Sequence, residues 1–132
     1  MSRQHYLNIA EKSNDLLFFD IESTGFKADY GSTLVISCKP FGMKATSFPV
    51  IQVGNDKKII REAKEMMENY GCWVSFYGKG FDIPFLNTRL LKWGIKPIEK
   101  RLHLDLFFTL KHNTSCPLIP KILRIAKGFS ET

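Results

Sequence analysis

The segment Leu17–Gly25 constrains the fold more than any other part of the chain, because it puts two acidic residues on one apolar strand. Its residues LFFDIESTG place Asp20 and Glu22 two positions apart. Strand side chains alternate between faces, so Asp20 and Glu22 share one face while Ile21 turns to the other. Burying two like charges side by side is costly unless a cation neutralises them, so the pair suggests a metal. The alternative is an edge strand whose acidic residues are simply solvated.

A second segment, Trp73–Leu86, combines an apolar strand, a glycine turn and an acidic residue at the start of a helix. Gly78 and Gly80 permit a tight turn, and Pro84 suits a first helical turn, where its missing N–H is not needed. We therefore expect Asp82 just outside a helix N-terminus, where the helix dipole stabilises an anion. A simple capping role would also explain Asp82, but it gives no reason for the acidic pair in the first segment.

Together the two segments resemble the ribonuclease-H-like superfamily of DEDD 3'-5' exonucleases, which includes the proofreading domains of DNA polymerases. The sequence FDIESTG is similar to the first motif of that family, and YGKGFDIPFL is similar to the second. The stretch HLDLFFTLK, with His103 and Asp105, is similar to a segment that follows the second motif in stand-alone members. The resemblance covers residues 16 to about 112 and implies a metal-dependent nuclease.

The sequence departs from the family pattern in two places. Phe76 and Tyr77 stand where members usually carry Asn or His before the turn of the second motif. The third motif, a Tyr or His followed by a fourth Asp, is absent, because no Asp follows Asp105 and no Tyr follows Tyr77. We therefore expect a chain that ends before the last catalytic helix, either as a fragment of a longer protein or as a naturally incomplete version.

The resemblance implies hydrolysis of phosphodiester bonds by a two-metal-ion mechanism. Two Mg²⁺ or Mn²⁺ ions require hard oxygen ligands. Asp20 would be the bridging carboxylate, Glu22 would hold the ion that activates water, and Asp82 would hold the other ion. Asp105 is a further candidate ligand, with a helix N-cap as its alternative role. His103 is either a ligand or base, or a structural residue between two leucines.

Candidate substrate-binding residues follow the acidic pair and lie in the second motif. By resemblance, Thr24 and Gly25 would meet the 3'-terminal nucleotide through backbone groups, although a turn after a strand also favours these residue types. Tyr77 is a candidate for stacking on bases. Phe81 and Trp93 could stack in the same way, but aromatic residues at such positions more often pack in the core.

Basic residues are concentrated in the C-terminal part of a chain whose formal net charge is +6. Residues 1–87 hold ten basic and ten acidic side chains, whereas residues 88–128 hold nine basic side chains against Glu99 and Asp105. Neutralising phosphates releases counterions, so this half suggests contact with single-stranded DNA or RNA, with Lys92 and Lys96 as candidate contacts. The alternative is that these side chains only keep the protein in solution.

We expect one α/β domain over residues 1–132, with the element order βββαβαβα and an incomplete C-terminal part. Strands are predicted at Leu16–Ile21, Thr33–Lys39, within Lys44–Val53 and at Cys72–Tyr77, and helices at Asp56–Tyr70, Pro84–Trp93 and Lys121–Lys127. Leu102–Leu104 is either a short strand or the entry into a helix that continues through Lys111. This is the ribonuclease-H-like order, a mixed five-stranded sheet of a three-strand antiparallel meander plus parallel strands, flanked by helices. Its first and fourth strands are neighbours, which brings Asp82 towards Asp20 and Glu22.

Two classes of protein are not expected. No run of 18 apolar residues could span a membrane, and the first residues show no apolar signal-peptide core. Cys38, Cys72 and Cys116 are widely spaced and odd in number, which favours a reduced, cytoplasmic setting over a disulfide framework.

Two functional hypotheses follow from the sequence. The first is a metal-dependent 3'-5' exonuclease acting on single-stranded ends, with a longer parent chain or a polymerase or replication protein as its partner. The second is a non-catalytic nucleic-acid-binding module of the same fold.

Overall fold

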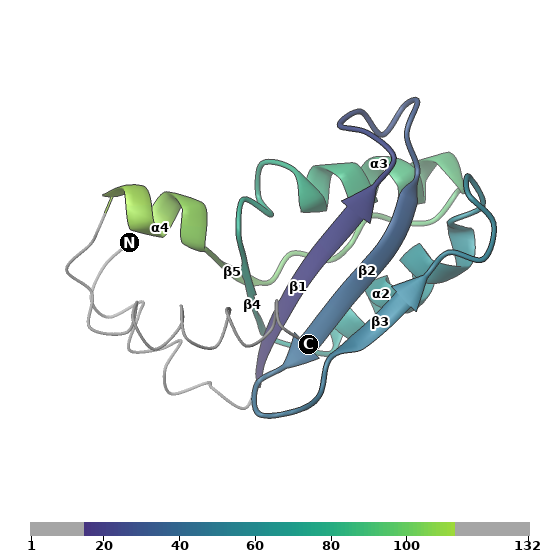
Figure 1. Ribbon diagram of the computed structural model, residues 1–132. Helices are drawn as coiled ribbons and strands as arrows, with labels where there is room; N and C mark the ends of the chain where they lie inside the picture. The colour runs from purple at the N-terminus through teal and green to yellow at the C-terminus, as the bar shows by residue number, and fades with distance from the viewer. Residues whose placement is uncertain (1–14, 113–132) are drawn as a thin grey trace.

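The computed structural model describes residues 15–112, which form a five-stranded mixed sheet with helices (Figure 1). The elements are β1 (Leu16–Ser23), β2 (Thr33–Pro40), β3 (Thr46–Pro49), α2 (Lys57–Glu68), β4 (Cys72–Ser75), α3 (Asp82–Lys92), β5 (Leu102–Asp105) and α4 (Leu106–His112). This order confirms the predicted βββαβαβα. The predicted helix Lys121–Lys127 and Cys116 lie outside the described residues.

The strands lie in the order β3-β2-β1-β4-β5, with β1 at the centre of the sheet. β1, β2 and β3 form an antiparallel meander, in which Ile36 of β2 pairs with Ile21 on one side and Phe48 on the other. β4 runs parallel to β1, and β5 runs parallel to β4. Parallel strands present their carboxyl ends at the same edge, so the segments that follow β1, β4 and β5 emerge together.

Side chains alternate along β1 as the sequence predicted. Leu17, Phe19 and Ile21 are buried in the main hydrophobic core, which also contains residues of α2 and α3. Asp20 and Glu22 alternate with them and are more exposed, although Asp20 is still partly desolvated. The helices α2 and α3 therefore cover one face of the sheet, and the two acidic side chains leave β1 towards the other.

A buried ion pair joins α3 to α2 and β2, and the sequence analysis did not identify it. The carboxylate of Asp56 is fully buried and accepts hydrogen bonds from Arg89 Nε (2.9 Å), Arg89 Nη2 (2.8 Å), Trp93 Nε1 (2.8 Å) and the Thr33 N–H (2.9 Å). Burial alone would raise the pKa of Asp56, but these hydrogen bonds hold it below its ordinary value. Asp56 is thus ionised, and the positive charge of Arg89 compensates its negative charge inside the core.

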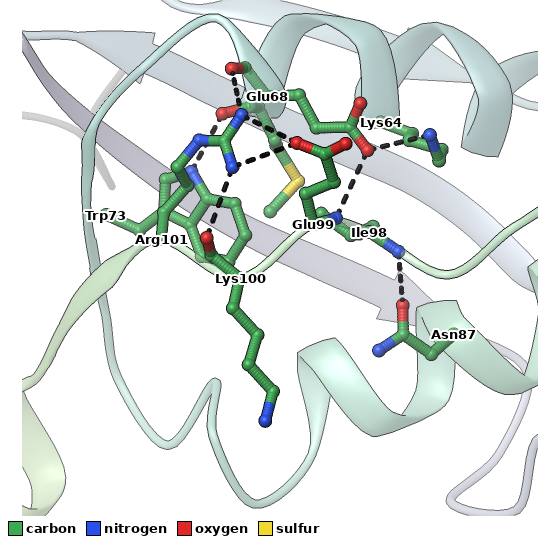
Figure 2. Close-up of polar contacts among 9 residues, drawn as sticks. Lys64, Glu68, Trp73, Asn87, Ile98, Glu99, Lys100 and Arg101 are labelled. Carbon is green, nitrogen blue, oxygen red and sulfur yellow. Dashed lines mark hydrogen bonds and ion pairs between the residues drawn. The ribbon is translucent and has the colours of Figure 1, made fainter.

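The connection between α3 and β5 is tied to both neighbouring helices (Figure 2). The Glu68 side chain accepts the Glu99 N–H at 3.2 Å, and the Glu68 carbonyl accepts a bond from Arg101 Nη2 at 2.8 Å. Asn87 Oδ1 accepts the Ile98 N–H at 2.9 Å. These contacts fix the chain on its way into β5, and so they fix the position at which β5 ends.

The observed elements differ from the predicted ones mainly at their ends. The strand predicted to reach Tyr77 ends at Ser75, because Tyr77 has a φ of 61°, which no strand residue adopts. Asp82 is the first residue of α3, not a residue just outside it. β3 covers only four residues of the predicted range Lys44–Val53, and a turn with Gly54 at a φ of 94° follows it.

Two observations concern membrane-spanning and disulfide-bonded proteins, the two classes that the sequence argued against. Within residues 15–112, no helix is long and apolar enough to cross a membrane. Cys38 is a free, buried thiol, and burial raises its pKa to about 12. A thiol with so high a pKa is unreactive at neutral pH, so Cys38 is a core residue.

Candidate active site

Three acidic side chains lie near the end of β1 and the start of α3. Asp20 and Glu22 project from β1, and Asp82 begins α3. The charge of Asp20 acts on the pKa of Asp82, and the charge of Glu22 acts on the pKa of Asp20. The structure therefore brings Asp82 within electrostatic reach of Asp20, in line with the predicted pairing of the first and fourth strands.

The carboxylates in this cluster repel one another. Burial, with smaller contributions from the charges of Asp20 and Asp105, raises the pKa of Asp82 to about 7, although the nearby Ile21 N–H acts in the opposite direction. Partial burial also raises the pKa of Asp20, and the neighbouring charge of Glu22 adds to this effect. Desolvation and like charges both favour the protonated form of an acid, so the cluster favours binding of a proton or a cation.

The chemistry of the cluster fits a divalent cation, but its geometry does not form a ready-made site. Carboxylate oxygens are the hard ligands that Mg²⁺ and Mn²⁺ prefer. Over residues 15–112, however, no group of three or more His, Cys, Asp and Glu side chains is arranged to hold a metal ion. Metal binding would require the three carboxylates to move closer together, and their roles as ligands stay predictions.

Asp105 holds the turn between β4 and α3. Its side chain is buried; Oδ1 accepts the N–H groups of Tyr77 (2.7 Å) and Phe107 (3.1 Å), and Oδ2 accepts the N–H of Lys79 (3.0 Å). The bond from Phe107, in the first turn of α4, matches the helix-cap alternative. Both oxygens are thus used by backbone amides, and the metal-ligand role of Asp105 stays a prediction.

The turn that leads to Asp82 has little room for side chains. A Cβ atom at Gly78 would collide with Ser75 Oγ, and one at Gly80 would collide with the ring of Tyr77. Both positions therefore need glycine, as the sequence predicted. Tyr77 itself has a φ of 61°, a left-handed conformation that residues with side chains rarely adopt.

His103 lies beneath this turn in a structural position. Its Nε2 atom is 2.6 Å from Ser75 Oγ, and Ser75 Oγ accepts the N–H of Gly78 at 3.1 Å. The imidazole ring packs against Phe19 and Trp73, with centroid distances of 5.5 and 5.8 Å. Burial lowers the pKa of His103 to about 4, so the ring is neutral at pH 7. These contacts match the structural alternative for His103.

Thr24 and Gly25 begin a loop that returns to β2. Thr24 Oγ1 accepts the Ser32 N–H at 2.9 Å, and the Thr24 N–H donates to the Ser32 carbonyl at 3.0 Å. The Gly25 carbonyl accepts a bond from Ser23 Oγ at 2.6 Å. These bonds give both residues the turn-forming role that was the alternative to substrate binding.

The basic side chains of the C-terminal half do not all face solvent. Arg89 is buried in its ion pair, and Arg101 donates to backbone carbonyls and to Glu99. Lys92 Nζ donates to the Asp29 carbonyl at 2.8 Å, and Lys96 is exposed. Fewer basic side chains are therefore available to bind phosphates than the charge of the sequence suggests.

Phe81 and Trp93 pack against the core, which was the expected role for both. Phe81 also lines a small cavity of about 160 Å³ at the start of α3, together with Phe26, Ala28, Gly80, Pro84, Phe85 and Thr88. A larger groove of about 490 Å³ lies between β3 and α2. None of the three carboxylates lines either of them.

Comparison with known proteins identifies the family of the chain and its similarity to DNA polymerases. A family model described as the RNase H superfamily matches residues 17–126. The DNA polymerase III PolC-type of Ureaplasma parvum serovar 3 is 27% identical over 122 residues, which covers 70% of this chain and 8% of that protein. The family B DNA polymerase of the hyperthermophilic archaeon Pyrobaculum calidifontis aligns with a TM-score of 0.66 and 17% identity, over 74% of this chain and 16% of that one. The chain thus spans a small part of either polymerase, and the likeness to the archaeal polymerase concerns the fold alone.

Proposed function

Because the chain belongs to the RNase H superfamily and has the mixed five-stranded sheet expected of it, we propose that it is a metal-dependent nuclease. The observation that supports the proposal is the electrostatic coupling of Asp20, on β1, to both Glu22 and Asp82. A cluster of partly buried like charges costs stability, and such costs are typical of functional sites. A cation bound by the three carboxylates would remove this cost.

In the proposed reaction, Asp20, Glu22 and Asp82 hold two Mg²⁺ or Mn²⁺ ions. When bound, such ions supply Lewis-acid activation of water and stabilise the charge of the scissile phosphate. Asp20 interacts electrostatically with both Glu22 and Asp82, which suits it to be the shared ligand. Asp82, with a pKa of about 7, must lose its proton before it can bind a cation.

The proposed substrate is a single strand of DNA or RNA, cleaved from its 3' end. The direction of cleavage rests on the resemblance of the two motifs. The cavity of about 160 Å³ lies at the start of α3, and Lys92 and Lys96 add positive charge at the other end of this helix. We also propose that the chain works with a polymerase or replication protein in a cytoplasmic setting, because one relative is a PolC-type DNA polymerase III.

A second candidate function is nucleic-acid binding without catalysis. It is favoured by the finding that no group of side chains within residues 15–112 is arranged to hold a metal ion. A chain of this kind would bind a single strand through its basic and aromatic side chains and leave the strand intact.

Cleavage of a 3'-labelled single strand in the presence of Mn²⁺ separates the two candidates. We would compare the chain with Asp20→Asn and with the matched control Asp29→Asn, because Asp29 is an exposed aspartate outside the carboxylate cluster. A nuclease should release the 3'-terminal nucleotide in the wild type and in the control, but not in Asp20→Asn. Equal cleavage by all three proteins would refute the role of the cluster. Salt-sensitive binding of the strand without cleavage by any of them would support the binding module.

A further inference from the structure

Four aromatic side chains gather beside the candidate active site, between the end of β4 and the start of α4. Phe107 is the central ring, and Phe76, Tyr77 and Phe108 surround it with centroid distances of 5.8, 4.8 and 5.1 Å. The three outer side chains are 64%, 42% and 39% exposed, respectively. We call Phe76, Tyr77 and Phe108 the aromatic surface. Exposed aromatic side chains that cluster in this way are typical of a binding site.

The backbone holds Tyr77 in this surface at a cost. Its φ of 61° is unfavourable for a residue with a side chain. Two hydrogen bonds from the Tyr77 and Lys79 amides to the buried carboxylate of Asp105 keep the turn in this conformation, and the missing side chain of Gly80 leaves room for the tyrosine ring. Strain that several contacts maintain is more frequent at functional sites than elsewhere.

One turn of the chain links the aromatic surface to Asp82 of the carboxylate cluster. The ring of Tyr77 lies over Gly80, two residues before Asp82. Lys79 lies in the same turn and its side chain is exposed. Its positive charge contributes to lowering the pKa of His103. One turn therefore carries an aromatic ring, a cation and a carboxylate of the candidate site.

The exposed area of this surface suits a few bases better than a protein. With about 200 Å² for each aromatic side chain, the three exposed fractions amount to about 300 Å². A stable protein interface needs about 800 Å² on each partner. Stacking on aromatic rings requires only the faces of one to three bases, and a nearby lysine suits a phosphate backbone.

We infer that the aromatic surface binds bases of the single strand whose 3' end lies at Asp20, Glu22 and Asp82. This inference rests on the proposed function for the identity of the ligand, but it does not require hydrolysis. It extends the expected stacking role of Tyr77 to Phe76 and to Phe108 on α4. The strand would then pass from the carboxylates over the turn and onto the start of α4.

The test is binding of a 12-nucleotide single strand that contains 2-aminopurine, measured in EDTA so that no cleavage is involved. Phe76→Ala and Phe108→Ala would be compared with the control Met43→Ala, because Met43 is 63% exposed in the turn after β2. Each aromatic substitution should weaken binding roughly 5- to 150-fold and reduce the quenching of 2-aminopurine. The dependence of affinity on salt should not change, because no charge is removed.

Several outcomes would overturn the inference. These are wild-type affinity and quenching in both aromatic variants, equal affinity for an abasic strand of the same length, or no binding of the strand by the wild type at low salt. Unchanged affinity together with loss of self-association in sedimentation would assign the surface to protein contacts instead. If the aromatic variants lose binding while the wild type cleaves nothing, the inference stands and the nuclease proposal fails.

Discussion

Replacing Asp82 by Asn should stabilise the metal-free chain, and the gain should grow with pH. Asn has nearly the same shape as Asp but carries no charge. The pKa of Asp82 is about 7 in the folded chain against an ordinary value of 3.8. Between these pH values the folded chain keeps a proton that the unfolded chain releases, so the stability of the wild type falls as pH rises. The contribution of Asp82 is complete below about pH 4 and is lost as pH rises through about 7.

The size of the effect follows from the same two pKa values. A difference of about three pH units, at 1.36 kcal/mol for each unit, gives at most about 4 kcal/mol. Asp82 is only 4% exposed, so solvent screens this effect little. The dipole of α3 acts in the opposite direction and favours the charged Asp82 by about 0.3–1 kcal/mol. Burial and like charge therefore outweigh the dipole.

Urea unfolding in EDTA at pH 4.5, 7 and 8.5 would measure this effect. We expect Asp82→Asn and the wild type to have similar free energies of unfolding at the lowest pH, and the variant to be the more stable by up to about 4 kcal/mol at the highest. The control Asp29→Asn should show no such trend. A variant less stable than the wild type at pH 8.5 would mean that the helix dipole outweighs burial and like charge, and would refute this account of the cluster.

Three further changes test other parts of the structure. Arg89→Met should lower the free energy of unfolding by about 3–5 kcal/mol in urea unfolding, because it leaves the charge of Asp56 buried without its partner; a loss below about 1 kcal/mol would contradict this role. Tyr77→Gly should be about 0.5–1 kcal/mol more stable than Tyr77→Ala, because glycine tolerates a positive φ; equal stability would argue against the left-handed conformation. Asp105→Ala should speed hydrogen exchange at the Tyr77 and Lys79 amides, and unchanged exchange by NMR would show that the carboxylate does not hold the turn.

The sequence predicted those features of the fold that depend on local patterns. The alternation of Phe19, Asp20, Ile21 and Glu22 indicates a strand with acids on one face, and this pattern depends only on strand geometry. The order of strands and helices then leaves few ways to arrange the sheet. The approach of Asp82 to Asp20 follows from that order, and Asp20 lies close enough for its charge to raise the pKa of Asp82.

The features that the sequence did not reveal depend on contacts between distant residues. The sequence places Asp56 at the start of a helix and Arg89 among the basic residues of the C-terminal half, with no sign that the two form an ion pair. Arg89 lies on the same side of α3 as the buried Phe85 and Leu86, and this position was the available signal for its burial. Tyr77 reads as a strand residue, and its left-handed conformation becomes evident only with the contacts of Asp105, 28 residues further along the chain.

Mn²⁺ binding to the metal-free chain tests most directly whether Asp20, Glu22 and Asp82 form one cation site. Electron paramagnetic resonance of free Mn²⁺ during a titration gives the affinity without any need for substrate. We expect the wild type and Asp29→Asn to bind Mn²⁺ equally, Asp20→Asn to bind it at least about tenfold more weakly, and binding to weaken below about pH 7 as Asp82 becomes protonated. Equal binding of Mn²⁺ by the wild type and by Asp20→Asn, or no binding by either, would contradict the proposed site.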